Sequence, residues 1–194
     1  MKVNASFFIM DPFDCATVYD HVGEPFGLRV KDGAVMAPPL FDREALLVRR
    51  DGSVRVENVD IRQLAVEIAI DRGAEDIVII GGLSGRLDHT LSTLAILEDL
   101  NARGIYGTVT DGQNRVRYMK STSTLIARSP YKYLSLIAAD EVVKGVDIEG
   151  CKYPLKKATL RRSHQFAVSN EITGNVAFIA IKKGGVYIIE SRDA

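Results

Sequence analysis

The sequence has no tryptophan and only two cysteines among its 194 residues. Cys15 and Cys151 show no paired spacing and no neighbouring histidine cluster, so neither a disulfide framework nor a zinc site is expected. The unbroken apolar runs, such as Ile77 to Ile80, are far too short to cross a bilayer, so no transmembrane helix is expected. Both cysteines are therefore expected to be buried, reduced thiols.

The remaining composition is that of a soluble globular protein. Apolar residues make up 46% of the chain and charged residues 26%, with seven tyrosines and seven phenylalanines. These values exclude disordered, collagen-like and coiled-coil chains. The start, Met1 to Phe8, lacks the long apolar core of a secretory signal, because Asp11, Pro12 and Asp14 follow closely. A cytoplasmic location is therefore expected.

The formal net charge of zero conceals an uneven distribution. Counting Lys and Arg against Asp and Glu, residues 1–58 carry −2, residues 59–112 carry −5 and residues 113–194 carry +7. The acidic middle is suited to metal-binding carboxylates and the basic last third to a surface that attracts phosphate, although ordinary surface charge is the commoner case. No dense basic cluster is interleaved with aromatics, so neither nucleic acid nor a membrane is an expected partner.

Residues 1–58 have the pattern of a β-meander. Candidate strands are 3–10 and 26–30, and a hairpin is expected from 45–49 and 54–57 around the Asp-Gly turn at residues 51 and 52. A second Asp-Gly turn at residues 32 and 33 and the Pro38-Pro39 pair break the segment further.

Residues 59–112 change to an alternating α/β pattern. A helix is expected from Asp60, at the N-cap, to a stop at Gly73, followed by a strand at 77–80 of the type buried on both faces of a parallel sheet. A glycine turn then leads into a second helix at 88–103, with Asp88 as its N-cap, and a strand at 108–110. The segment predicts a truncated, Rossmann-like α/β unit.

Residues 113–194 return to a period of two. Seven short strands separated by turn signals predict an antiparallel β-sandwich or barrel domain. These strands are expected at 116–119, 124–127, 131–137, 142–148, 165–170, 176–181 and 185–190. The predicted fold is thus α/β plus all-β in three parts, with boundaries near residues 58 and 112.

The segment Gly81-Gly82-Leu83-Ser84-Gly85-Arg86-Leu87-Asp88-His89 carries the clearest chemical signal. Glycines after a buried strand let the backbone turn sharply towards a ligand, and the N-terminus of the next helix favours an anion. Arg86 can bind phosphate through paired hydrogen-bond donors. Asp88 can bind Mg²⁺ or accept a hydrogen bond from a ligand, and His89 can orient Asp88 or the ligand. The segment lacks the ending of a Walker A loop, and such a turn is also a common structural element.

The same segment, Gly-Gly-x-x-Gly-Arg-x-Asp-His, resembles the thiamine pyrophosphokinase family, and four further matches follow in order. These are Asp111-Gly112-Gln113-Asn114, Tyr133-Leu134-Ser135-Leu136-Ile137, Gly150-Cys151-Lys152-Tyr153-Pro154-Leu155 and Val168-Ser169-Asn170-Glu171. The resemblance covers about residues 60–190.

This resemblance implies an enzyme that transfers the pyrophosphoryl group of ATP to thiamine with Mg²⁺, giving thiamine diphosphate and AMP. Asp88 and Asp60 would be the catalytic and metal-binding carboxylates, and Arg86 would hold phosphate. Gly81, Gly82, Gly85 and His89 would line the ATP site. The resemblance also implies a homodimer, in which Ser169 and Asn170 hydrogen-bond the aminopyrimidine of thiamine across the subunit interface.

The chain departs from this family before Asp60. It has no Asp-Gly-Gly and no Gly-Asp-x-Asp-Ser segment, which in the family carry acidic residues for metal and ATP. Instead, residues 3–8, 27–33, 38–39 and 43–52 resemble a segment of the phosphodiester glycosidase domain of the enzyme that uncovers mannose 6-phosphate. Three functions stay open: a pyrophosphokinase, a catalytically inactive thiamine-binding module, and a phosphodiester glycosidase relative.

A truncated parallel sheet would leave a bare edge, which invites aggregation. The N-terminal segment is therefore expected to cover the exposed edge or face of the sheet in residues 60–112.

Overall fold

The computed structural model describes residues 61–193 apart from Ser84, with side chains from Gln63 onward except those of Leu64 and Ile68, and the backbone of six short strands before them. The chain divides into two compact units, Met1–Gly107 and Thr108–Ala194. The predicted boundaries at residues 58 and 112 stay predictions. No helix in the described part is long and apolar enough to span a membrane. Cys151 is buried as a free thiol, as expected, whereas Cys15 lies outside the described residues.

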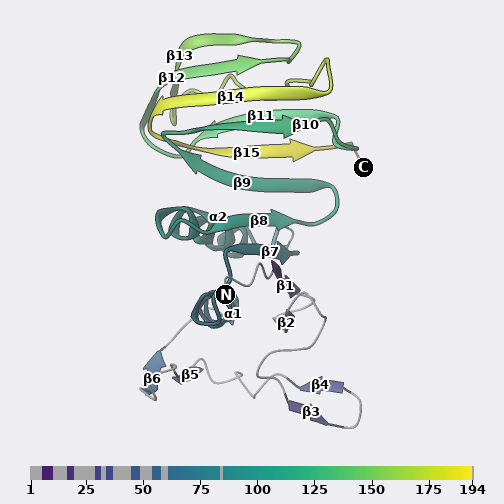
Figure 1. Cartoon of the computed structure of the whole chain (residues 1–194), viewed down its shortest axis with the longest axis vertical. Helices are drawn as coiled ribbons and strands as arrows, with labels where there is room; N and C mark the ends of the chain where they lie inside the picture. The colour runs from purple at the N-terminus through teal and green to yellow at the C-terminus, as the bar shows by residue number, and fades with distance from the viewer. Residues whose placement is uncertain are drawn as a thin grey trace. The chain divides into compact units, whose positions relative to one another are not determined.

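The first unit contains a parallel strand pair formed by segments far apart in the sequence. Strand β1 (Ser6–Met10) runs parallel to β7 (Asp76–Ile80), and β2 (Thr17–Tyr19) pairs antiparallel with the other side of β1 (Figure 1). The expectation that the N-terminal segment covers the edge of the parallel sheet is therefore confirmed.

The other N-terminal strands form two separate hairpins. Strands β3 (Arg29–Lys31) and β4 (Ala34–Met36) pair with each other, as do β5 (Ala45–Val48) and β6 (Val54–Glu57). The predicted hairpin of 45–49 with 54–57 is confirmed, but a single β-meander is wrong, since the three strand pairs belong to three different sheets. Turn residues in the sequence predict only pairings between neighbouring strands. They do not predict the pairing of β1 with β7, which lies about 70 residues away.

Two helices accompany β7. Helix α1 (Ile61–Asp71) ends as predicted, because Gly73 adopts a left-handed conformation at φ +86° and donates its N–H to the carbonyl of Ile70 at 2.8 Å. Helix α2 (Leu87–Ala102) buries one stripe of side chains: Thr93, Ile96, Leu97 and Leu100. Arg103, just after α2, binds Glu67 of α1 through two hydrogen bonds of 2.7 and 3.0 Å, which fixes the helices to each other.

Strand β7 is buried on one face rather than on both. Ile77 and Ile79 are fully buried, but Val78 is only half-buried and Ile80 is 37% exposed. The prediction from the all-apolar sequence of this strand is therefore wrong. A short β-branched run has no polar position to show which face is open, so periodicity could not reveal the difference.

The second unit is the predicted antiparallel β-sandwich. One sheet contributes, in order, β11 (Tyr133–Ala138), β15 (Gly185–Ser191), β9 (Asn114–Lys120) and β8 (Tyr106–Thr110), of which β8 begins in the first unit. These strands belong to a seven-stranded mixed sheet that also contains β7, β1 and β2, so the predicted separate antiparallel sheet is corrected here. The other has the order β10 (Ser123–Ala127), β14 (Val176–Lys183), β12 (Val142–Glu149) and β13 (Leu155–Arg161). Every pairing between these strands is antiparallel.

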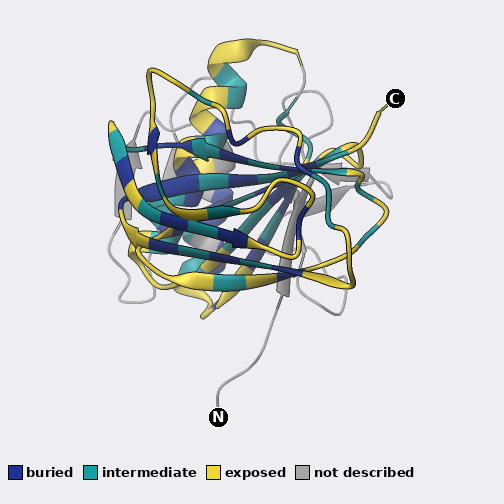
Figure 2. Ribbon diagram, turned by 90° about the horizontal axis from the view of Figure 1, so that it is seen from above, coloured by how far each residue is buried: buried dark blue, intermediate teal, exposed yellow. Residues whose placement is uncertain are grey.

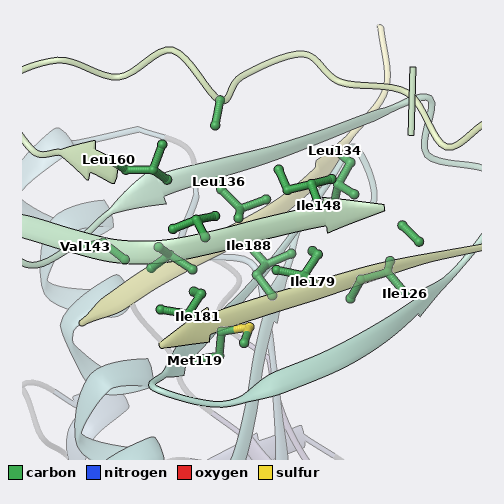
Figure 3. Packing of buried hydrophobic residues seen from close by; sticks show 14 of the residues in the cluster. Met119, Ile126, Leu134, Leu136, Val143, Ile148, Leu160, Ile179, Ile181 and Ile188 are labelled. Carbon is green, nitrogen blue, oxygen red and sulfur yellow. The ribbon is translucent and has the colours of Figure 1, made fainter. Parts of the chain in front are cut away.

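Aliphatic side chains from both sheets form one core in the second unit (Figure 3). Leu134, Leu136 and Ile188 come from the first sheet, and Ile148 and Ile179 from the second, each at most 2% exposed. Burial alternates along the strands, so the remaining positions are open to solvent (Figure 2). Each fully buried Leu or Ile contributes about 2 kcal/mol of transfer free energy, which makes this core the main stabilising feature of the unit.

Two strand predictions in this unit are wrong. Residues 155–161 form the edge strand β13, which the sequence did not reveal because its only fully buried residue is Leu160 and lysines break the alternation. Residues 165–170 do not form a strand, although Ala167 makes one backbone hydrogen bond with β11 and Asn170 makes two. Ser169 lies in the left-handed region at φ +55°, which is incompatible with continued extended pairing.

Candidate functional site

The glycine turn between β7 and α2 has the backbone shape that the sequence predicts. Gly81, Gly82 and Gly85 have φ angles of +99°, +72° and +83°, a region that residues with side chains rarely adopt. A Cβ atom at Gly85 would meet no other atom within 4 Å, so the backbone angle and not lack of space requires glycine there. Helix α2 then starts at Leu87, with its free N–H groups next to the turn.

Arg86 and Asp88 form an ion pair at the start of α2. The Nε of Arg86 donates to Oδ1 of Asp88 at 3.1 Å, and Nη2 donates to Oδ2. Their side chains are 73% and 61% exposed, so water screens the pair. The helix begins one residue earlier than expected: Arg86 occupies the N-cap position without a side-chain cap, and Asp88 lies in the first turn. The predicted capping role of Asp88 is therefore wrong.

The Asp88 carboxyl is held in its ionised form. Hydrogen bonding from Arg86, with a smaller contribution from the backbone N–H of His89 at 3.0 Å, lowers its pKa below the usual range. His89 is half-buried, and its carbonyl accepts a hydrogen bond of 2.8 Å from the hydroxyl of Thr93. The start of α2 thus presents an exposed anion and an exposed cation on a turn that favours phosphate.

One further predicted site residue and one other residue of the glycine turn lie outside the described part of the chain. Asp60, the second predicted carboxylate, and Ser84 of the glycine turn are not among the described residues. In the described part of the chain, no three His, Cys, Asp or Glu side chains come together as metal ligands.

In the second unit, three of the sequence motifs lie side by side. These motifs, residues 150–155, 168–171 and β11, are far apart in the sequence. The N–H of Lys152 donates to the carbonyl of Glu171 at 2.9 Å. Leu134 and Asn170 exchange two backbone hydrogen bonds of 2.7 and 3.0 Å. Gly150 lets the first of these segments pass close to β14, because a Cβ atom there would lie 2.4 Å from the carbonyl oxygen of Val176.

Asn170 joins these segments through its side chain. It is 5% exposed, and its Oδ1 accepts from the N–H groups of Tyr153 at 2.9 Å and Glu171 at 3.0 Å. Its Nδ2 donates to the carbonyl of Tyr153 at 2.7 Å. Asn170 therefore stabilises the loops in the structure, while its predicted contact with thiamine stays a prediction.

Ser169 is the exposed member of the same loop. Its backbone N–H donates to the hydroxyl of Ser135 at 2.9 Å, and its own side chain points away from the core. Three large side chains from the two loops are also exposed, by 58%, 46% and 44%: Tyr153, Phe166 and Val168. The loops therefore offer a hydroxyl and apolar surface, which suits a flat heterocycle with polar substituents.

The loop at Asp111 forms the hairpin turn between β8 and β9, and the Asp111 side chain is hydrogen-bonded within that turn. Oδ1 of Asp111 accepts from the N–H groups of Gln113 at 2.9 Å and Asn114 at 2.6 Å. Gly112 takes a left-handed conformation at φ +85°. The hydrogen bonds and the left-handed glycine show that the residues of this motif stabilise the turn.

Sequence reasoning missed a charged cluster on the inner face of β9 and β15. Glu190 is 2% exposed and binds Arg115 and Arg117, one of which lies directly opposite it in the sheet. The sequence did contain a sign of this cluster. Glu190 follows Val186 and Ile188 at a spacing of two residues, so in a strand it lies on the same buried face as they do.

Part of the chain is similar to one family of known proteins. Residues 122–186 match the family described as thiamin pyrophosphokinase, vitamin B1 binding domain. The thiamine pyrophosphokinase of Bacillus subtilis is 27% identical over 131 residues, which cover 67% of this chain and 61% of that protein. Thiamin pyrophosphokinase 1 of Caenorhabditis elegans is 25% identical over 126 residues, 60% of this chain and 49% of that protein.

The fold agrees with this similarity. The crystal structure of thiamine pyrophosphokinase from Bacillus subtilis superposes with a TM-score of 0.66 at 25% identity, over 71% of this chain and 64% of that one. Over the matched part, the chain is similar to thiamin pyrophosphokinases. It spans only about half to two-thirds of the length of these relatives. Neither the family match nor these relatives support the resemblance of residues 1–58 to a phosphodiester glycosidase segment, which stays a prediction.

Proposed function

We propose that this chain is a thiamine pyrophosphokinase, which transfers pyrophosphate from ATP to thiamine and releases AMP. The observation that carries the proposal is the match of residues 122–186 to the vitamin B1 binding domain. The motif at the start of α2 adds the elements that a phosphate-transfer reaction needs: a glycine turn, a helix N-terminus, a cation and a carboxylate.

The exposed ion pair suits a role in ATP binding. Because water screens the contact between Arg86 and Asp88, little free energy is lost when the two separate. Arg86 would then turn to the phosphates of ATP, where a guanidinium group forms paired, charge-assisted hydrogen bonds. The positive φ angles of Gly81 and Gly82 let the backbone approach the same phosphates closely.

Asp88 is the described residue that fits Mg²⁺. Mg²⁺ commonly arrives with the phosphates of its substrate and needs only one or two carboxylates from the protein. The lowered pKa of Asp88 keeps its carboxyl ionised at neutral pH, as a magnesium ligand requires. When bound, Mg²⁺ would neutralise phosphate charge, and Asp60 is the proposed second carboxylate.

Thiamine would bind at the loops of the second unit. Ser169 offers an exposed hydroxyl for the aminopyrimidine, and the apolar surface of Tyr153, Phe166 and Val168 suits the two aromatic rings. Asn170 would act mainly by holding the loops in place through its three side-chain hydrogen bonds. We also propose a homodimer, in which these loops complete the site of the partner subunit.

A second candidate function is thiamine binding without transfer. It is favoured by the missing acidic motifs before Asp60 and by the fact that described residues contribute a single carboxylate to the glycine turn. Such a module would keep the loops of the second unit and lack the metal-binding half.

The two functions are distinguished by product analysis. The full chain is incubated with thiamine, ATP and Mg²⁺, and AMP and thiamine diphosphate are separated by chromatography. A pyrophosphokinase forms both in equal amounts, and Asp88→Asn reduces the rate by about 100-fold or more. Thiamine binding without AMP would establish the binding module instead.

Asp99→Asn is the matched control. Asp99 is a partly exposed aspartate on the same helix, and it also pairs with an arginine, Arg103 at 2.9 Å. Its substitution should leave the rate unchanged, because it lies at the far end of α2 from the glycine turn. If Asp88→Asn keeps the full rate at saturating Mg²⁺, the carboxylate has no role in holding the metal.

A further inference from the structure

The charged cluster on the inner face of β9 and β15 has unequal numbers of positive and negative groups. Arg115 and Arg117 both bind Glu190, and no other acidic side chain among the described residues pairs with either arginine. The cluster therefore carries one excess positive charge inside a sheet face that otherwise contributes to the core. The two arginine side chains are each 32% exposed, so water screens part of this charge, and a further group of opposite sign beside them would neutralise the rest.

The carboxylate of Glu190 can accept nothing more. Oε1 accepts from Nη2 of Arg115 and from the hydroxyl of Ser129 at 3.1 Å. Oε2 accepts from Nε of Arg115 at 2.9 Å and from Nη2 of Arg117. With four donors on two oxygens, the carboxylate is saturated.

Arg115 is fixed by this arrangement. Its guanidinium group lies over the ring of Tyr131, 5.0 Å from the ring centre, besides its two bonds to Glu190. The hydroxyl of Tyr131 in turn lies 3.3 Å from that of Thr110. Arg115 is thus held in place on several sides.

Arg117 is not satisfied in the same way. Its Nη2 reaches Glu190, but its Nε is buried and has no hydrogen-bond partner among the described residues. Buried donors in folded proteins are nearly always paired, so this one requires an explanation. The side chain as a whole is 32% exposed although its Nε is buried, so solvent reaches part of this side chain.

A hydroxyl lies next to this arginine. In the pairing of β8 and β9, Thr108 is directly opposite Arg117 and therefore on the same face of the sheet. Thr108 is half-buried, and its hydroxyl can donate or accept. The position beside Arg117 thus combines guanidinium donors, a hydroxyl and one uncompensated positive charge.

We propose that Arg117, with Thr108 beside it, forms a binding site for a small oxyanion such as phosphate or a carboxylate. The oxyanion would accept from the donors of Arg117 that Glu190 does not use and would cancel the excess charge. Guanidinium groups match the oxygens of phosphates and carboxylates in geometry as well as in charge. The site lies within the second unit and does not depend on pyrophosphoryl transfer.

The test follows the Nε–H signals of arginine in NMR spectra of the full chain. Inorganic phosphate or acetate is added at constant ionic strength, with sodium chloride as the reference salt. We expect the Nε–H signal of Arg117 to shift with saturation for phosphate, acetate or both, and the responding anion tells the two sources apart. If neither anion shifts this signal with saturation, the proposal is wrong and water fills the position.

Variants sharpen the test. Arg117→Lys keeps the positive charge but loses the Nε–H and the planar fork, so the anion should bind about tenfold more weakly. Arg161→Lys makes the same change at an exposed arginine of β13 and should leave the affinity unaltered. An equal loss in both variants would show that general surface charge attracts the anion and would overturn the proposal. If Arg117→Lys does not fold, the signal in the unaltered chain still decides.

Discussion

The two units hold their polar motif residues in opposite ways. In the first unit, Arg86 and Asp88 are exposed and bind each other two positions apart in the sequence. In the second unit, Asn170 reaches Tyr153 across 17 positions, and Glu190 reaches Arg115 across 75, both from buried positions. An exposed local pair can change partners when a ligand arrives, whereas a buried long-range pair holds the fold together. The difference separates groups suited to chemistry from groups that build the scaffold.

The largest effect is expected at Glu190. Glu190→Gln leaves two arginines around a neutral amide, and we expect the free energy of unfolding to fall by about 3 kcal/mol, at the low end for a broken buried ion pair because both arginines are partly exposed. Urea unfolding measures the change. Glu149→Gln, which removes a carboxylate from an exposed pair with Lys156, should cost less than about 0.5 kcal/mol. Equal losses in the two variants would contradict the contrast between buried and exposed groups.

A smaller loss is expected at Asn170. Asn170→Ala removes three hydrogen bonds and leaves the backbone groups of Tyr153 unpaired, which should lower the free energy of unfolding by about 2 kcal/mol. Thiamine affinity should fall with it, since the loops lose their support. Ser169→Ala, one position away, should reduce affinity while leaving stability within about 0.5 kcal/mol. If Asn170→Ala loses affinity without losing stability, Asn170 contacts the ligand instead.

The smallest effect concerns the pH dependence of Asp88. Its pKa is lowered in the folded chain, chiefly by hydrogen bonding from Arg86. The resulting stabilisation is complete above the unfolded pKa of about 3.9 and disappears as the pH falls through the lower folded value. Arg86→Gln should raise the pKa of Asp88 in an NMR titration, whereas Arg103→Gln should leave it in place. An unchanged value in Arg86→Gln would mean that the pair does not persist in solution.

Much of the fold follows from local sequence patterns. The helix ending at Gly73, the glycine turn and most strands of the sandwich were predictable, because glycine positions and alternating burial are local properties. The argument that a bare sheet edge must be covered predicted that the N-terminal segment would lie there, but it did not predict that β1 would pair with β7 in parallel. Edge strand β13 escaped detection, since its exposed lysines mask the single fully buried Leu160.

The sequence names residues for the candidate site, and their roles toward ligands stay predictions. It does not show that the side-chain amide of Asn170 is hydrogen-bonded to the backbone of Tyr153. Likewise, the charges of Arg115, Arg117 and Glu190 look like ordinary surface residues until the register of β9 and β15 brings them together. Contacts between distant positions depend on register, which composition and spacing do not specify.

Calorimetric titration of the full chain with thiamine, with and without Mg²⁺ and ATP, tests the proposed function most directly. We expect saturable binding that Asp88→Asn retains and Ser169→Ala weakens, together with release of AMP when Mg²⁺ and ATP are present. Absence of any thiamine binding would contradict the account and would leave the similarity of the second unit to the vitamin B1 binding domain as shared ancestry of the fold alone.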